Sequence, residues 1–159
     1  MEALYKNFFR KENNIDPVLT ALERIPIFDN LLKKELKNIA QLTHEREYKS
    51  NEYVFKKHAP AEGMYVILHG EIEIKDPKSG NIFAKLYSGD FFGELALLDE
   101  EPRSASAICK VSSRLIGFFR TDLLTLINRY PELGNKILLN LSRVLGERLR
   151  ETNKNIIKS

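Results

Sequence analysis

Between Gly93 and Ser104 the chain carries the residue types that can hold a small anion. Gly93 allows a close backbone approach, and the apolar run after it predicts one helical turn whose free N–H groups would face an anion. Arg103 has a planar guanidinium that matches two phosphate oxygens, and Pro102 fixes the backbone just before it. Glu94 can accept a hydrogen bond from a sugar hydroxyl, while Ser104 adds a hydroxyl and an N–H. Together they predict a ligand that is both anionic and polyhydroxylated.

The composition places these residues in an ordinary globular domain. The chain has 159 residues, 43% hydrophobic and 30% charged, and its net charge of +3 is too small for a protein that coats a polyanion. The single cysteine, Cys109, excludes an internal disulfide framework and lies in an apolar stretch that favours a buried, inert thiol. No apolar run approaches the roughly 18 residues of a membrane span. Met1–Lys6 lack a secretion signal, so we expect a cytoplasmic protein without membrane contact.

Short runs of β-branched and aromatic residues fill the middle of the chain. Turn residues such as Asn51, Gly70 and the segment 76–81 separate these runs. Many short antiparallel strands at close intervals predict a sandwich, a roll or a barrel. The expected strands are 53–55, 64–68, 71–75, 82–86, 104–109 and 115–119.

Helical spacing precedes and follows the strands. An apolar stripe over residues 31–40 predicts a helix capped by Asp29 or Asn30, and Thr121 is the expected N-cap of the first helix after the strands. Residues 1–15 form an N-terminal extension in which apolar side chains four residues apart predict a short helix docked on the main body.

A long amphipathic helix is predicted to begin at Pro131. Leu138, Leu141, Leu145 and Leu149 recur at spacings of three and four and form one wide apolar face. Such a helix is too long to be covered by a small β-domain alone. We therefore expect it to pair with a copy of itself in a homodimer.

Two uninterrupted strings identify the family that this sequence resembles. Residues 92–98, Phe-Gly-Glu-Leu-Ala-Leu-Leu, and residues 102–106, Pro-Arg-Ser-Ala-Ser, are similar to the phosphate-binding cassette of the cyclic nucleotide-binding domain family. Residues 22–28 resemble the leading segment of that family, and residues 64–74 resemble its central hairpin. The resemblance covers roughly residues 16–157 and includes both the catabolite activator proteins and the regulatory subunits of protein kinase A.

The resemblance implies an α+β fold: an eight-stranded antiparallel β-roll, also called a jelly-roll or double-stranded β-helix, flanked by N-terminal helices and a long C-terminal helix. The domain would span residues 16–159. Within it the roll would occupy about 46–120 and the C-terminal helices about 121–155.

The resemblance also implies a role for each cassette residue. Glu94 would bind the ribose 2′-hydroxyl, with help from the backbone of Gly93 and Leu95. Arg103 would pair with the cyclic phosphate. Ser104 would bond the same phosphate through its hydroxyl or its amide.

Four further positions would surround the base. Ile74 and Leu86 fall where the family lines the base and ribose with apolar side chains, although plain core positions are an equal alternative. The helix 141–153 resembles the dimer helix of the catabolite activator proteins, in which a threonine and the next residue meet adenine, the second from the partner subunit. Thr152 and Asn153 occupy those positions here, and Asn153 replaces a serine.

The choice between cAMP and cGMP depends on two of these positions. A threonine at the place of Ser104 favours guanine in eukaryotic relatives, whereas a serine accompanies cAMP in the bacterial activators. Ser104 alone leaves the base open. Thr152 favours cAMP, with a cGMP-selective sensor of the same fold as the alternative.

The output is expected to be a protein contact. Only six residues follow Asn153, too few for a helix-turn-helix, so we expect a stand-alone bacterial-type member that binds no DNA by itself. The C-terminal helix would shift between two positions as ligand binds and thereby signal to an unidentified protein effector.

Two other function classes remain open. A ligand-free interaction module could keep the fold, but such relatives usually lack the cassette glutamate or arginine, and both are present here. A cupin-like enzyme would need two or three histidines and a carboxylate on one metal. His44, His58 and His69 are scattered along the chain, so we expect neither a metal nor an enzyme.

Overall fold

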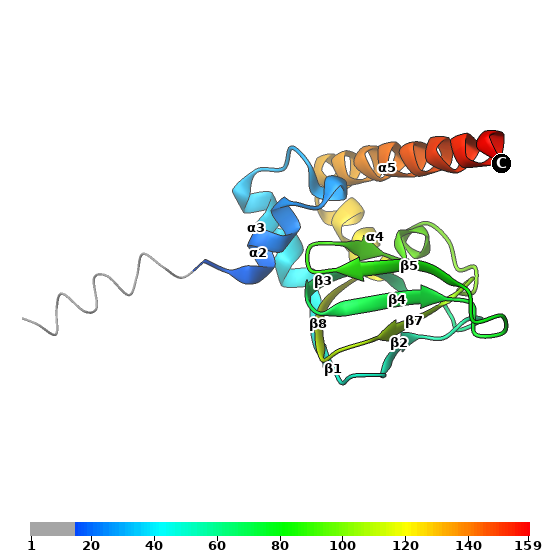
Figure 1. The fold of residues 1–159 in the computed structure, drawn as a ribbon. Helices are drawn as coiled ribbons and strands as arrows, with labels where there is room; N and C mark the ends of the chain where they lie inside the picture. The colour runs from blue at the N-terminus through cyan, green and yellow to red at the C-terminus, as the bar shows by residue number, and fades with distance from the viewer. Residues whose placement is uncertain (1–14) are drawn as a thin grey trace, which may run out of the picture.

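The computed structural model describes residues 15–159, and the docking helix expected in the N-terminal extension lies outside the described residues. Helices at both ends of the chain flank a middle of short strands (Figure 1). The helical elements are α2 (Pro17–Glu23), η1 (Pro26–Phe28), α3 (Lys33–Leu42), η2 (Glu94–Leu97), α4 (Arg120–Arg129) and α5 (Pro131–Lys158). The strands are β1 (His44–Tyr48), β2 (Tyr53–Phe55), β3 (Gly63–His69), β4 (Glu71–Lys75), β5 (Ile82–Tyr87), β6 (Phe91–Phe92), β7 (Ser106–Cys109) and β8 (Ser113–Phe119).

The strands form two antiparallel four-stranded sheets, ordered β1-β8-β3-β6 and β2-β7-β4-β5. The predicted α+β class, with an eight-stranded antiparallel roll and a long C-terminal helix, is confirmed. The expected hairpin over residues 64–74 is wrong, because β3 pairs with β6 and β8 while β4 pairs with β5 and β7. Gly70, at φ 124°, instead turns the chain from one sheet into the other and helps to close the roll.

Two of the eight strands, β1 and β6, were not predicted from the sequence. β1 has the sequence His-Glu-Arg-Glu-Tyr, and every residue but Tyr48 is exposed, so no apolar alternation marks it. It is an edge strand, held by pairing with β8 and by an ion pair between Glu45 and Arg114. β6 has only two residues, too few to show any period. Both strands are defined by their partners rather than by their own sequence.

The predicted helix caps are also wrong. α3 begins at Lys33, because the carboxylate of Glu35 accepts a 2.7 Å hydrogen bond from the backbone N–H of Leu32. In α4 the third-position residue Asp122 has the same function, and Thr121 lies inside the helix. In both helices a carboxylate in the first turn satisfies a free N–H near the N-terminus and complements the helix dipole.

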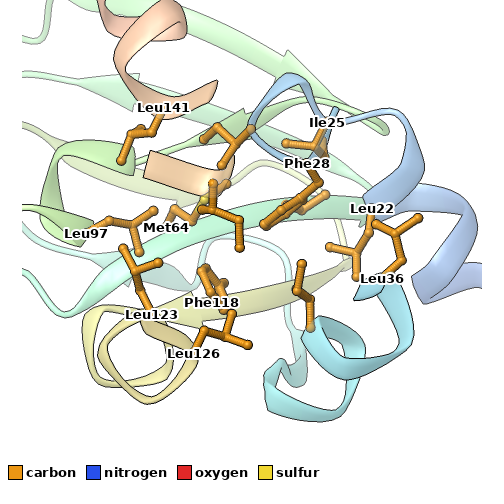
Figure 2. Close-up of a cluster of buried hydrophobic side chains, with 14 of the residues drawn as sticks. Leu22, Ile25, Phe28, Leu36, Met64, Leu97, Phe118, Leu123, Leu126 and Leu141 are labelled. Carbon is orange, nitrogen blue, oxygen red and sulfur yellow. The ribbon is translucent and has the colours of Figure 1, made fainter. Parts of the chain in front are cut away.

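Hydrophobic packing fixes the helices on the roll. One cluster joins α2, η1, α3, α4 and α5 to β3 and β8, and at its centre the rings of Phe28 and Phe118 meet edge to face at 5.7 Å (Figure 2). A second cluster fills the roll and includes Ile67, Ile72 and Cys109. Burial raises the pKa of the Cys109 thiol, which agrees with an inert cysteine.

The two halves of α5 have different surroundings. All of its buried residues lie between Leu133 and Val144, where the helix packs against the roll, α4 and η1. Every residue from Glu147 to Ser159 is exposed, and in Figure 1 the red end of α5 stands clear at the C-terminus. The first half of the helix is therefore anchored, and the second half is bare.

A buried asparagine anchors the first half of α5. The Asn140 amide donates to the backbone carbonyls of Ile27, at 3.2 Å, and Asp29, at 2.9 Å. Its carbonyl oxygen accepts a 3.1 Å hydrogen bond from Arg143. These bonds tie α5 to η1 across a long separation in sequence.

We expect Asn140→Leu to lower the free energy of unfolding by about 1–3 kcal/mol, because two inward carbonyls lose their donor. Urea denaturation of the variant and the wild type measures the difference. Ser142→Ala, two residues along the helix and exposed, is the control and should stay within about 0.5 kcal/mol of the wild type. An Asn140→Leu variant as stable as that control would show that the amide does not anchor the helix.

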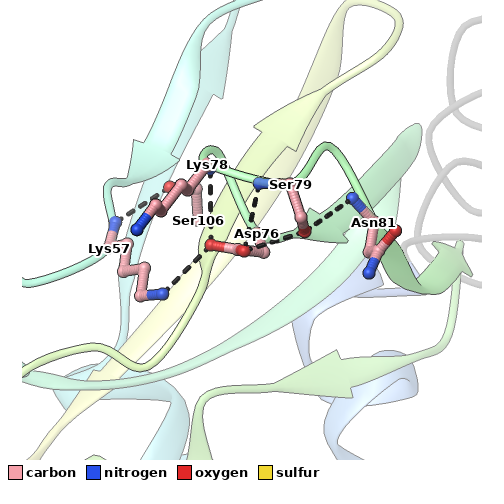
Figure 3. A network of polar contacts seen from close by, with 6 residues as sticks. All are labelled: Lys57, Asp76, Lys78, Ser79, Asn81 and Ser106. Carbon is pink, nitrogen blue, oxygen red and sulfur yellow. Dashed lines mark hydrogen bonds and ion pairs between the residues drawn. The ribbon is translucent and has the colours of Figure 1, made fainter.

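A second polar network holds the turn between β4 and β5 (Figure 3). Asp76 Oδ1 accepts a 3.0 Å hydrogen bond from Lys57 Nζ, and Oδ2 accepts from the hydroxyl of Ser79 at 2.8 Å. The backbone N–H of Lys57 in turn donates to Ser106 Oγ at 2.8 Å. Hydrogen bonds from Lys57 and Ser79 lower the pKa of Asp76 to about 2.

This network predicts a loss of stability in acid. The carboxyl of Asp76 has a pKa of about 2 when folded against an ordinary 3.8, so its stabilising effect is fully present above about pH 4 and is lost as the pH falls toward 2. Asp76→Asn should therefore lower stability at pH 7 and make a smaller difference at pH 2.5. Urea denaturation at both pH values measures the gap, with the exposed Glu151→Gln as control. An equal gap at the two pH values would contradict this assignment.

Candidate functional site

A cavity of about 560 Å³ lies between the second sheet, the segment from β6 to residue 105, and α5. Its aliphatic and aromatic wall comes from β2, β4, β5 and β6, while charged side chains come from η2, the loop after it, and α5. The lining residues that carry the argument below are Phe55, Ile74, Leu86, Gly93, Glu94, Leu95, Arg103, Ser104 and Arg148.

Gly93 starts the cassette in a conformation that favours glycine. Its φ of 76° and ψ of 19° are left-handed, and it directly precedes η2. A Cβ built on Gly93 would lie 2.8 Å from Nη1 of Arg103. The residue therefore has to be small for the guanidinium to lie against the backbone at the start of the turn.

Arg103 is a buried cation that forms no salt bridge with any carboxylate of residues 15–159. Nη2 donates to the carbonyl of Gly63 at 2.6 Å and Nη1 to the carbonyl of Gly93 at 3.3 Å. Nε is the one fully buried side-chain nitrogen or oxygen of the described chain without a hydrogen-bond partner. Burial lowers the pKa of Arg103, yet arginine stays charged in proteins. A buried charge with free donors fits an anionic ligand group.

Glu94 is buried beside this arginine and pairs with α5. Its carboxylate forms an ion pair with Arg148, whose guanidinium also lies 4.7 Å from the ring centroid of Phe91. The Glu94 side chain is 6% exposed and that of Arg148 is 48% exposed, so the helix residue forms the solvent-side partner. This contact joins the otherwise bare half of α5 to the cassette.

Arg120 fastens the far end of the cassette to α4. Its Nη1 donates to the carbonyls of Ala61 at 3.2 Å, Ala96 at 3.1 Å and Asp99 at 2.7 Å. Nη2 donates to the carboxylate of Glu100 at 3.1 Å. These bonds position η2 and the loop after it relative to the roll.

The structure brings together seven of the nine residues that the sequence assigned to the ligand. Ile74, Leu86 and the five cassette residues all line the cavity. Thr152 and Asn153 do not line it within this chain. Both are exposed on α5, and the Thr152 hydroxyl donates to the backbone carbonyl of Arg148 at 2.9 Å.

Among the residues that sequence reasoning did not assign to the site, three have charged or aromatic contacts that shape it: Phe55, Arg120 and Arg148. Arg148 lies four residues before Thr152, and that spacing places both on one helical face, so the signal was available. Phe55 falls in the expected strand 53–55, and no role was predicted for Arg120 from the sequence. Nothing in their neighbouring residues marks either as a partner of the cassette.

Between residues 15 and 159 no three His, Cys, Asp or Glu side chains gather as a metal site. None of the helices in that range is both long and apolar enough to cross a membrane.

The cavity of the roll has a largely apolar wall that also carries a buried arginine and a buried carboxylate. This combination fits a binding domain for a small anionic ligand. The chain belongs to the cyclic nucleotide-binding domain family, whose model matches residues 45–130. That match covers more than half of the chain and includes the whole cassette. The family consists of regulatory binding domains rather than catalysts.

Individual relatives agree with this assignment. A cyclic AMP receptor protein of Thermus thermophilus is 32% identical over 129 residues, which is 79% of this chain and 58% of that protein. A CRP-like cAMP-activated global transcriptional regulator of Mycobacterium tuberculosis is 28% identical over 138 residues, 85% of this chain and 60% of that protein. The chain thus spans less than two thirds of the length of these relatives. A crystal structure of a cyclic nucleotide-binding domain from Methylobacillus flagellatus is 27% identical, covers 90% of this chain and 82% of that one, and has a TM-score of 0.75.

Proposed function

We propose that this chain is a cytoplasmic cAMP-binding regulator that takes up the nucleotide in the cavity without a metal ion. The observation that carries the proposal is the buried guanidinium of Arg103, which forms no ion pair with a carboxylate of residues 15–159 and whose Nε has no hydrogen-bond partner there. A second buried charge, the carboxylate of Glu94, lines the same cavity. Arg103 and Ser104 would bind the cyclic phosphate. Glu94 would accept from the ribose 2′-hydroxyl, and Ile74 and Leu86 would contact the ribose and base.

Two considerations support cAMP over cGMP. The relatives from Thermus thermophilus and Mycobacterium tuberculosis are a cyclic AMP receptor protein and a cAMP-activated regulator by name. Thr152 and Asn153 are exposed on the bare half of α5, free to meet adenine when that helix shifts or when a second subunit contributes it. Ser104 is compatible with either base.

The output of the regulator would be carried by α5. The first half of this helix is anchored, so a shift of the second half would present a new surface to a protein effector. Glu94 and Arg148 connect that half to the ligand, because the ribose hydroxyl and the guanidinium share one carboxylate.

Calorimetric titration of cAMP and cGMP into the purified chain, freed of bound nucleotide, tests this proposal. We expect cAMP to bind more tightly than cGMP. Tighter cGMP binding would make Ser104 the selecting residue and remove the role given to Thr152. Binding of neither would leave a ligand-free interaction module.

We further propose that α5 forms a homodimer through its exposed apolar side chains, which include Leu149 at 61% and Ile156 at 66% exposure. Leu149→Asp should shift dimers to monomers, because a carboxylate would be buried in an apolar seam. Sedimentation velocity over a range of protein concentrations measures the shift, with the exposed Glu147→Gln as control. A wild type that stays monomeric at every concentration would rule out this dimer.

A further inference from the structure

The Arg103 guanidinium lies over an aromatic ring that the cassette itself does not supply. Cζ of Arg103 lies 4.0 Å from the ring centroid of Phe55 and 6.0 Å from that of Tyr65. Phe55 ends β2, far from the cassette in sequence, and lines the cavity. Its ring is therefore part of the site although it offers no hydrogen bond to a ligand.

Phe55 is itself held firmly. Its ring centroid lies 6.1 Å from that of Tyr65 and 5.9 Å from that of Phe92, and the last two rings stack at 5.6 Å. Phe92 directly precedes Gly93, the residue whose carbonyl accepts from Nη1 of Arg103. The three rings connect the face of the guanidinium to the backbone that holds its edge.

An aromatic face has an advantage over a carboxylate at this position. A carboxylate would neutralise the buried cation but would also occupy the N–H groups that a phosphate needs. The π-face of Phe55 attracts the cation without accepting from any in-plane N–H. Within residues 15–159, two of the five guanidinium N–H groups donate to the backbone carbonyls of Gly63 and Gly93, and the other three have no protein acceptor there.

We propose that Phe55 is a positioning residue for Arg103: its ring fixes the plane of the guanidinium and stabilises the charge while leaving the free donors for the ligand phosphate. This inference rests on the proposed function, in which Arg103 binds the cyclic phosphate. The backbone carbonyls of Gly93 and Gly63 fix Nη1 and Nη2 of the guanidinium. The Phe55 ring prevents the guanidinium from rotating about the line that joins these two nitrogens. The arginine is thereby set in place before the nucleotide arrives.

The first test compares cAMP affinities by calorimetry for Phe55→Leu, Phe55→Tyr and the wild type. We expect Phe55→Leu to bind about tenfold more weakly and Phe55→Tyr, which keeps the ring, to stay within about twofold. Tyr53→Leu is the matched control, because this ring lies on the same strand with Lys56 at 5.2 Å and does not line the cavity. In an Arg103→Ala background the Phe55→Leu change should have no more than about a twofold further effect.

The second test reads the position of Arg103 without nucleotide. In a ¹H–¹⁵N spectrum the Nε–H signal of Arg103 should be shifted by the ring above it, and Phe55→Leu should remove that shift while Phe55→Tyr and Tyr53→Leu retain it. A Phe55→Leu variant that binds cAMP like the wild type, or keeps the shifted signal, would overturn the proposal. A wild type that binds no cyclic nucleotide would overturn the proposed function instead, and the spectrum would still report whether Phe55 positions the arginine.

Discussion

Arg103→Ala should weaken cAMP binding by about 2–5 kcal/mol, because the variant leaves a phosphate charge unpaired in a cavity with a mainly apolar wall. At about 1.4 kcal/mol for each factor of ten, the loss lies between roughly 30-fold and several thousandfold. Calorimetry on the variant and the wild type measures it directly. The structure makes this the most damaging single change at the site, since no other buried cation of the described chain lines the cavity.

Two companion variants separate charge from geometry. Arg103→Lys keeps a positive charge but loses the planar fork and its contact with the Phe55 ring, so we expect an affinity between those of the wild type and Arg103→Ala. Arg129→Ala removes an exposed arginine of α4 and should leave the affinity unchanged. An Arg103→Ala variant that folds and binds cAMP as tightly as the wild type would refute the phosphate assignment.

Glu94→Gln should weaken cAMP binding by about 1.5–3 kcal/mol, or roughly 10- to 150-fold, because a hydrogen bond from the ribose hydroxyl to a charged acceptor becomes one to a neutral amide. In this structure the buried carboxylate is paired with Arg148, so the variant also weakens that ion pair. The measurement is again calorimetric. It should be made with cAMP and with 2′-deoxy-cAMP on both proteins.

The deoxy ligand makes the test specific to the hydroxyl. The wild type should prefer cAMP over 2′-deoxy-cAMP by a factor similar to the Glu94→Gln loss, and the variant should show little preference between the two. A general disturbance of the cavity would weaken both ligands equally on the variant and preserve the preference. That result would contradict the assignment of Glu94 to the ribose hydroxyl.

The cassette could be predicted from the sequence because its functional residues are neighbours in the chain. Gly93, Glu94, Arg103 and Ser104 occur within one short string, and the left-handed conformation of Gly93 is the one that favours glycine. Phe55 could not be found in this way. It reaches Arg103 only because β2 and the strand after the cassette, β7, are paired in one sheet.

The same distinction applies to the fold. Strands with a buried face could be predicted from their apolar residues. β1 could not, because it is exposed almost throughout and is defined by its pairing with β8. The start of α3 was misplaced because a carboxylate three residues inside the helix, Glu35, satisfies the backbone N–H of Leu32. The long apolar face of α5 was predicted from the sequence. Its division into an anchored half and a bare half was not, because that division depends on where the roll ends.

The ion pair between Glu94 and Arg148 has a thermodynamic consequence for any molecule that binds the bare half of α5. If such a molecule draws Arg148 away from the carboxylate, it must change the affinity of the cavity for nucleotide. The nucleotide then changes the affinity for that molecule by the same factor, because the coupling free energy between two sites is reciprocal. An effector that acts in this way would therefore also change the affinity of the protein for nucleotide. Nucleotide titrations with and without the effector would measure the coupling free energy.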